Sequence, residues 1–248
     1  MASTYETGCI QNVANFETLI SYITAFGNDY NPSKTSLKIP ELQKILSEAK
    51  TSLNAVNVAF SAHSNAIAAR ESAFEPLSKL VTRVNNALKA TDTTTQVDDS
   101  AKTIVRKIQG TRASAKLTEE QKQALAAEGK EVNQVSASQM GFNDRIENFD
   151  KLITLLSSIP NYAPNEEELK IESLTAYLND LKSKNAAVLP LEVQLSNARI
   201  LRNDIQDRPL TGLIDAALDS KVYIKSVFGA SSPQYKQISK LAFVKRKK

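Results

Sequence analysis

The chain reads Asn15-Phe16-Glu17-Thr18-Leu19-Ile20 near its start and Asn148-Phe149-Asp150-Lys151-Leu152-Ile153 in its second half. Aromatic and aliphatic side chains keep the same spacing in both stretches, and that spacing belongs to one apolar face of a helix. The recurrence predicts that the chain contains an internal duplication. Phe16 and Phe149 are then expected to occupy equivalent buried sites.

Further segments recur in the same order along the chain. Tyr30-Asn31-Pro32-Ser33 is answered by Tyr162-Ala163-Pro164-Asn165, and Leu37-Lys38-Ile39 is answered by Leu169-Lys170-Ile171 at the same offset. Arg70 likewise has Arg202 as its counterpart. These matches predict helical repeat one at 1–110, a charged linker with a short helix at 111–138, helical repeat two at 139–244 and a basic tail at 245–248.

The composition favours an all-α protein. The 248 residues are 42% hydrophobic and include only 7 Gly, 8 Pro and no Trp, a usage that suits long helices better than turn-rich β structure. One helical repeat is too small to bury a broad apolar face alone. We therefore expect an internally duplicated helical bundle of two pseudo-symmetric multi-helix repeats, packed about a two-fold axis or, as the less favoured alternative, laid end to end.

Two long helical patterns carry the expected core. Apolar residues of the first helix form one stripe, and the second helix shows two seven-residue series typical of a coiled-coil seam. In the second repeat Pro190 falls inside the corresponding helix, which predicts a kink or break near Val188 with packing moved to nearby leucines. The stripe comprises Val13, Phe16, Ile20 and Ile23; the two series comprise Leu46, Leu53, Phe60 and Ile67, and Leu42, Ala49, Val56 and His63; the leucines are Leu189, Leu191 and Leu195.

The sequence predicts a cytoplasmic protein. The first residues lack the basic and apolar regions of a secretory signal, and no stretch approaches the roughly 18 apolar residues that would favour a membrane-spanning helix. Cys9 is the single cysteine, which excludes an internal disulfide, and its place near the N-terminus suggests a frayed helix end and an idle thiol.

No enzymatic motif is present, so we expect no catalytic residues, no cofactor and no metal site. His63, the single histidine, lies on the apolar seam, where a packing role is favoured over catalysis. The acids Glu166, Glu167 and Glu168 could bind a cation, but their position at an expected helix start already explains them through the helix dipole. Arg70, Arg202, Tyr30 and Tyr162 are predicted to hold the common fold, with a ligand groove between the copies as the alternative.

Basic residues form one internal patch and one tail. The formal charge is +4, but the four basic residues at the end account for it, so the remaining body is neutral. A solvated helix face and a solubilising tail are favoured over phosphate contacts, because no aromatic residues alternate with the cations. The candidate nucleic-acid-binding residues are Lys102, Arg106, Lys107, Arg112, Lys116, Lys245, Arg246, Lys247 and Lys248.

Four motifs carry a resemblance to known sequences. They are the repeated Asn-Phe-(Glu/Asp)-x-Leu-Ile and Tyr-x-Pro-(Ser/Asn), the stretch Ala-Phe-Glu-Pro-Leu-Ser-Lys-Leu at 73–80 and Ser-Pro-Gln-Tyr-Lys-Gln at 232–237. In these motifs the chain resembles uncharacterised all-helical proteins of Bacteroidetes-type bacteria. The resemblance implies a bacterial origin and transfers no activity or site.

We therefore expect a non-enzymatic helical protein that acts as a macromolecular interaction, scaffold or assembly module. Its partner would be an unknown protein or another copy of the chain. The alternative is a nucleic-acid- or ribosome-associated protein that uses the basic tail and the 102–116 patch. A small-molecule carrier with a groove between the repeats has less support.

Overall fold

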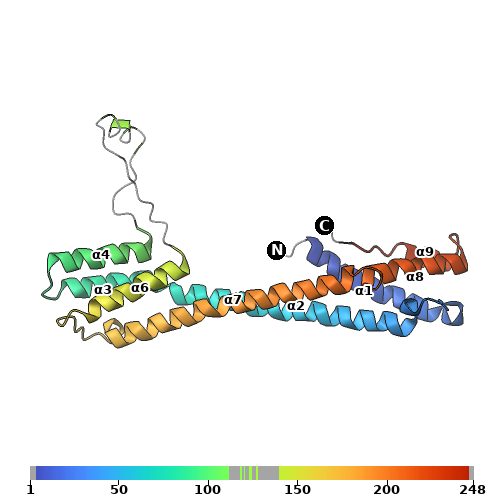
Figure 1. Cartoon of the computed structure of the whole chain (residues 1–248), viewed down its shortest axis with the longest axis horizontal. Coiled ribbons are helices and arrows are strands. Elements are labelled where there is room, and N and C mark those ends of the chain that lie inside the picture. Colours follow the sequence, from blue (N-terminus) through green and yellow to red (C-terminus); the bar gives the residue numbers. More distant parts are fainter. Residues whose placement is uncertain are drawn as a thin grey trace. The chain divides into compact units, whose positions relative to one another are not determined.

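The computed structural model describes residues 4–111 and 140–245 and five isolated positions between them, 118, 120, 123, 124 and 127. Every regular element described is a helix, which confirms the all-α prediction (Figure 1). The α-helices are α1 (Thr4–Ala25), α2 (Ile39–Phe74), α3 (Leu77–Lys89), α4 (Thr95–Gln109), α6 (Phe142–Ser157), α7 (Ile171–Asp207), α8 (Leu213–Phe228) and α9 (Pro233–Ser239), and the 3-10 helices are η1 (Gly27–Asp29), η2 (Thr35–Leu37) and η3 (Glu167–Leu169).

The described chain forms two compact units. The terminal unit combines Met1–Ser64 with Leu191–Lys248, and the central unit is Asn65–Pro190. Both boundaries fall inside helices, because α2 and α7 each contribute residues to both units. Each unit thus takes helices from both predicted repeats. The boundaries of the two repeats and the linker, at 1–110, 111–138 and 139–244, were inferred from recurring sequence segments. They stay predictions.

The terminal unit packs the start of the chain against its end. Its core joins apolar side chains of α1 and α2 to those of α8 and α9, and α1 lies beside α8 (Figure 1). The first-helix stripe is confirmed, since Val13, Phe16, Ile20 and Ile23 are all buried. The prediction of a frayed Cys9 is wrong: α1 begins at Thr4, and Cys9 has 0% exposure. Two further turns of helix place its thiol among buried side chains.

The central unit has its own core. It is built from apolar faces of α3, α4 and α6, which lie together in Figure 1, and from the ends of α2 and α7 that belong to this unit. Phe149 is fully buried at 0% exposure, like Phe16 in the terminal unit, so both predicted phenylalanine sites are core sites. Gly110 ends α4 with a left-handed φ of 67°, a conformation that glycine adopts without steric cost.

The expected seam of α2 is confirmed for most members of its two series. Leu42, Ala49 and Val56 are buried, and Leu46 and Leu53 are half-buried against the terminal core, whereas Phe60 is 53% exposed. Phe60 lies near Ser64, where α2 passes from one compact unit to the other. The helix face that the terminal core covers is therefore not covered along the whole of α2.

Of the kink or break expected near Val188 in α7, the break is wrong. Pro190 stands inside one continuous helix from Ile171 to Asp207. Of the leucines expected to take over the packing, Leu195 is buried and Leu191 is half-buried, but Leu189 is 65% exposed. The ring of Pro190 removes one backbone donor without ending the helix, because the flanking turns keep their own hydrogen bonds and both compact units hold α7.

Candidate functional site

Two tyrosines close the connectors that lead into the long helices. The Tyr30 hydroxyl donates to the Leu37 carbonyl at 2.9 Å, and the Tyr162 hydroxyl donates to the Leu169 carbonyl at 2.9 Å. Burial raises the pKa of both phenols, that of Tyr162 to about 12. A buried phenol that stays protonated and donates to backbone is a structural anchor. The predicted structural role of Tyr30 and Tyr162 fits these contacts.

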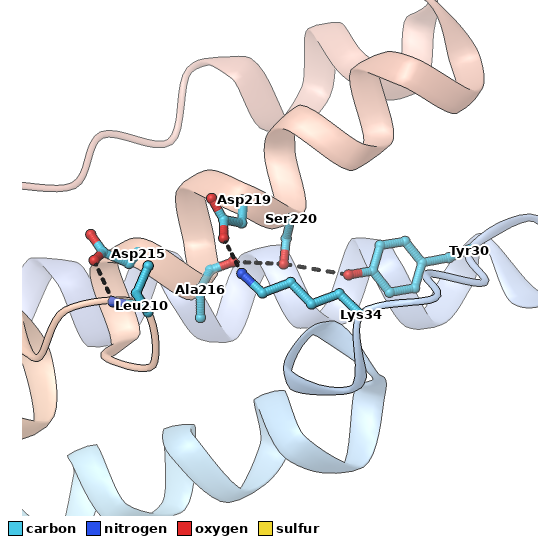
Figure 2. Close-up of polar contacts among 7 residues, drawn as sticks. All are labelled: Tyr30, Lys34, Leu210, Asp215, Ala216, Asp219 and Ser220. Carbon is cyan, nitrogen blue, oxygen red and sulfur yellow. Dashed lines mark hydrogen bonds and ion pairs between the residues drawn. The ribbon is translucent and has the colours of Figure 1, made fainter.

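In the terminal unit the first connector is joined to α8 by polar contacts (Figure 2). Ser220 Oγ lies 3.4 Å from the Tyr30 hydroxyl oxygen and donates its own hydrogen to the Ala216 carbonyl at 2.7 Å. Lys34 pairs with Asp219, with 2.6 Å between Nζ and Oδ2. All of these groups are satisfied by the protein itself, so this network binds the connector to α8 and offers no open reactive group.

A second polar cluster holds the tail segment, which we define as residues 241–245. Asn12 on α1 is 0% exposed; its Oδ1 accepts from the Val244 N–H at 2.8 Å and its Nδ2 donates to the Val244 carbonyl at 2.9 Å. Asn15 donates to the Ala242 carbonyl at 2.7 Å. Lys245 forms an ion pair with Asp215 at 3.1 Å. Sequence reasoning missed this cluster, although a polar Asn12 beside the buried stripe of α1 was a usable signal.

A groove lies between α2 and α7 in the terminal unit. It is an open groove of about 380 Å³, and its α2 side consists mostly of small side chains. The α7 side contributes Leu201, which is 53% exposed, and Ile205, which is 8% exposed. Glu48 and Arg208 add one charge of each sign. The complete lining is Ser47, Glu48, Thr51, Ser52, Ala55, Leu201, Ile205 and Arg208.

Exposed apolar side chains are concentrated in the same unit. Among the described residues, large apolar side chains that face solvent are far more numerous in the terminal unit than in the central unit, where Met140 and Leu189 are exposed. Scattered exposed leucines are normal on any protein, but their greater number on the terminal unit makes that unit the better candidate for association. The terminal-unit residues are Ile10, Val58, Phe60, Val193, Ile200, Leu201, Leu210, Leu218, Val222, Val227 and Val244.

The paired arginines have separate surroundings. The Arg70 guanidinium stacks 4.0 Å from the ring centroid of Phe142, and its Nη1 donates to Asn185 Oδ1 at 3.4 Å. Arg70 therefore joins α2 to α6 and α7 within the central unit. Arg202 is 3% exposed and donates to Asn203 Oδ1 at 2.9 and 3.1 Å.

The residues weighed for catalysis or metal binding have ordinary partners. His63 is half-buried on α2. Glu167 pairs with Lys170 at 2.5 Å, and Glu168 pairs with Arg83. Within 4–111 and 140–245, no group of three or more His, Cys, Asp or Glu side chains is placed to hold a metal ion.

The candidate basic residues are divided between the units. Lys102, Arg106 and Lys107 lie on α4 of the central unit, whereas Lys245 belongs to the terminal unit. The pKa of Glu147 is lowered mainly by the hydrogen bond from Lys151 and to a smaller extent by Lys107, so Lys107 lies near a carboxylate. Lys245 is paired with Asp215, as described above. Arg112, Lys116, Arg246, Lys247 and Lys248 lie outside the described residues.

No helix in the described part of the chain is long and apolar enough to cross a membrane. Comparison of the chain with protein-family models, with curated proteins and with solved structures found no match.

Proposed function

We propose that the protein is a non-enzymatic interaction module whose terminal unit binds an amphipathic helix of a partner protein in the groove between α2 and α7. The observation that carries this proposal is the groove itself, with exposed Leu201 and nearly buried Ile205 on one side and small side chains on the other. Helix-in-groove recognition uses apolar anchors spaced along one helix face, and such anchors need a cleft of this kind.

The side chains of α2 suit the close approach of another helix. Ser47, Thr51 and Ala55 recur every four residues along the groove, so they form one row on α2. Small side chains in such a row let a partner backbone come near, and burial of Leu201 then contributes roughly 25 cal/mol per Å² of apolar surface removed from water. Arg208 in the groove lining is already paired with Asp204, so the apolar side chains of the groove, more than its charges, would select the partner.

The internal duplication belongs to the same proposal. Each half has a buried tyrosine bonded to a leucine carbonyl, and each of these leucines ends a 3-10 helix that precedes a long helix. The long helices begin at Ile39 and Ile171, which are matched positions in the sequence. A duplicated ancestor would explain why both connectors are closed by the same tyrosine contact, although most of the exposed large apolar side chains in the described residues lie in the terminal unit.

A site-specific crosslinker tests the groove. A photoreactive phenylalanine in place of Thr51 is expected to capture, in the native cell, a partner segment whose apolar residues recur with helical spacing. When the photoreactive residue at position 51 is combined with Leu201→Asp, the adduct should be lost. A charge on the groove wall opposes the burial of the partner's apolar side chains. The matched control is Ile200→Asp, which changes the 63% exposed neighbour outside the groove lining. Equal adducts from both aspartate variants would contradict the proposal, as would capture of segments without helical apolar spacing.

Nucleic-acid binding is the alternative function, and the basic residues Lys102 and Arg106 are the observation that supports it. Neither cation forms an ion pair with another described residue, and the two are one turn apart on α4. Retention on DNA or RNA that falls with salt, and that is weakened when both are changed to alanine, would favour this alternative over the groove. No retention at low salt would remove it.

A further inference from the structure

The tail segment is held mainly through its main chain. Asn12 pairs with both the N–H and the carbonyl of Val244, at 2.8 and 2.9 Å, and Asn15 pairs with the Ala242 carbonyl at 2.7 Å. Lys221 donates to the carbonyls of Ser239 and Leu241, each at 3.0 Å. A side-chain amide carries a donor and an acceptor side by side, as a peptide group does, so Asn12 recognises backbone whatever side chain the bound residue carries.

The recognising amide is fixed in place. Asn12 and Gln206 are both 0% exposed, and Asn12 Nδ2 also donates to Gln206 Oε1 at 3.0 Å. Gln206 in turn donates to the Cys9 carbonyl at 3.1 Å. This chain of bonds from α7 orients Asn12 toward the tail, which lowers the entropy lost when a peptide binds.

The side chains of the tail are held less firmly than its backbone. Val244 is 51% exposed, and Phe243 is only half-buried against the terminal core. The ion pair of Lys245 with Asp215 joins two side chains that are 53% and 25% exposed. The segment therefore defines a ligand pattern: an aromatic residue, a next residue whose peptide groups face Asn12, and a basic residue that reaches Asp215.

We infer that this surface of α1 is a peptide-binding site, that the tail segment is its resident ligand, and that an extended segment of another protein with the same pattern can replace it. This site is separate from the groove between α2 and α7, so it adds a second recognition surface to the proposed function. Main-chain hydrogen bonds supply affinity in such sites, and the flanking side chains supply specificity.

The site favours exchange of ligands over an empty state. If the tail leaves, Asn12 keeps its bond to Gln206 but loses both partners on Val244, and water has to take their place. An incoming peptide restores the same two bonds to backbone. The tethered tail competes at an effective concentration in the millimolar range, so an incoming peptide binds the intact chain more weakly than it binds a chain whose tail is weakened.

A full-length variant with a weakened tail tests the inference. The variant combines Leu241→Ser, Phe243→Ser and Val244→Pro. These changes remove two apolar side chains and the N–H that donates to Asn12 Oδ1. Hydrogen exchange should show that residues 240–245 lose protection while the helices keep theirs. A fluorescent peptide with the sequence of residues 240–245 should then bind the variant at least about tenfold more tightly than it binds the wild-type chain, the size expected for one lost buried hydrogen bond.

The control changes the peptide and leaves the protein untouched. Methylation of the valine amide nitrogen removes the single N–H that reaches Asn12 and should weaken binding about tenfold. A peptide with alanine in place of its last lysine should bind more weakly, and this loss should shrink at high salt. The inference would be overturned by a tail that stays protected in the variant, by absence of peptide binding, or by equal binding of the methylated peptide. None of these outcomes bears on the crosslinking test of the groove.

Discussion

At the scale of single residues, Tyr30 and Tyr162 each stabilise a connector, one in each compact unit. Each is 6% exposed and donates its hydroxyl hydrogen to a leucine carbonyl across a connector. Tyr30→Phe and Tyr162→Phe should each lower the free energy of unfolding by about 1–3 kcal/mol, because a buried carbonyl loses its partner. Urea unfolding measures both. Tyr22→Phe is the control, since no described hydrogen bond involves its hydroxyl, and it should stay within about 0.5 kcal/mol of the wild type.

The same tyrosines make stability fall at alkaline pH. Burial is the main reason why the pKa of Tyr162 rises from 10.0 to about 12, so the folded state holds the phenol proton more tightly than the unfolded state. The resulting stabilisation is complete below pH 10 and is lost as the pH rises through 12. Unfolding measured across this window should show a smaller loss for Tyr162→Phe than for the wild-type chain. An identical loss in both would contradict the pKa assigned to Tyr162.

At the scale of elements, the turn between α7 and α8 is tightly packed. Leu210 has a left-handed φ of 67°, and its N–H donates to Asp215 at 2.9 Å. A Cβ at Gly212 would lie 2.6 Å from the Arg208 carbonyl oxygen, so Gly212→Ala must displace backbone and should destabilise the protein by about 1–3 kcal/mol. In α1, by contrast, Gly8→Ala meets nothing closer than 3.7 Å and should stabilise by about 1 kcal/mol. Thermal unfolding of both variants checks the opposite signs.

The two long helices differ at matched positions. Pro190 lies inside α7, and its sequence counterpart in α2 is Val58, which is 61% exposed. An interior proline removes a hydrogen bond and crowds the preceding turn, at a cost of about 3 kcal/mol. Pro190→Val should therefore stabilise the protein by about 1–3 kcal/mol, and Val58→Pro should destabilise it by about 3 kcal/mol. The denaturant midpoints of both variants measure these changes, and no gain from Pro190→Val would mean that proline costs little at this position.

At the scale of the whole molecule, two separate cores predict two regions of local stability. Leu19 of the terminal unit and Leu152 of the central unit are both 0% exposed. Each leucine-to-alanine change should cost about 2–5 kcal/mol. Leu19→Ala should speed amide exchange mainly in 4–64 and 191–245, and Leu152→Ala mainly in 65–111 and 140–190. Uniform acceleration along the chain in both variants would show that the two cores open together.

The helices themselves could be predicted because their signals are local. The apolar spacing around Phe16 and Phe149 identified two buried faces, and the stripe from Val13 to Ile23 is buried as expected. The predictions failed at positions whose burial or conformation depends on the tertiary neighbours that pack against the helix. Phe60 continued a regular series and is nevertheless exposed, and Pro190 predicted a break that the flanking turns of α7 do not show.

The sequence by itself determined that this is an all-helical protein with buried faces on α1 and α6, because helical periodicity is a property of neighbouring residues. Only the tertiary structure decided which faces meet. It placed α1 against α8, brought Val244 to Asn12, paired Lys245 with Asp215, and formed the groove between α2 and α7. Those contacts join residues far apart in the chain, and a periodic pattern states that a face is buried without stating what covers it.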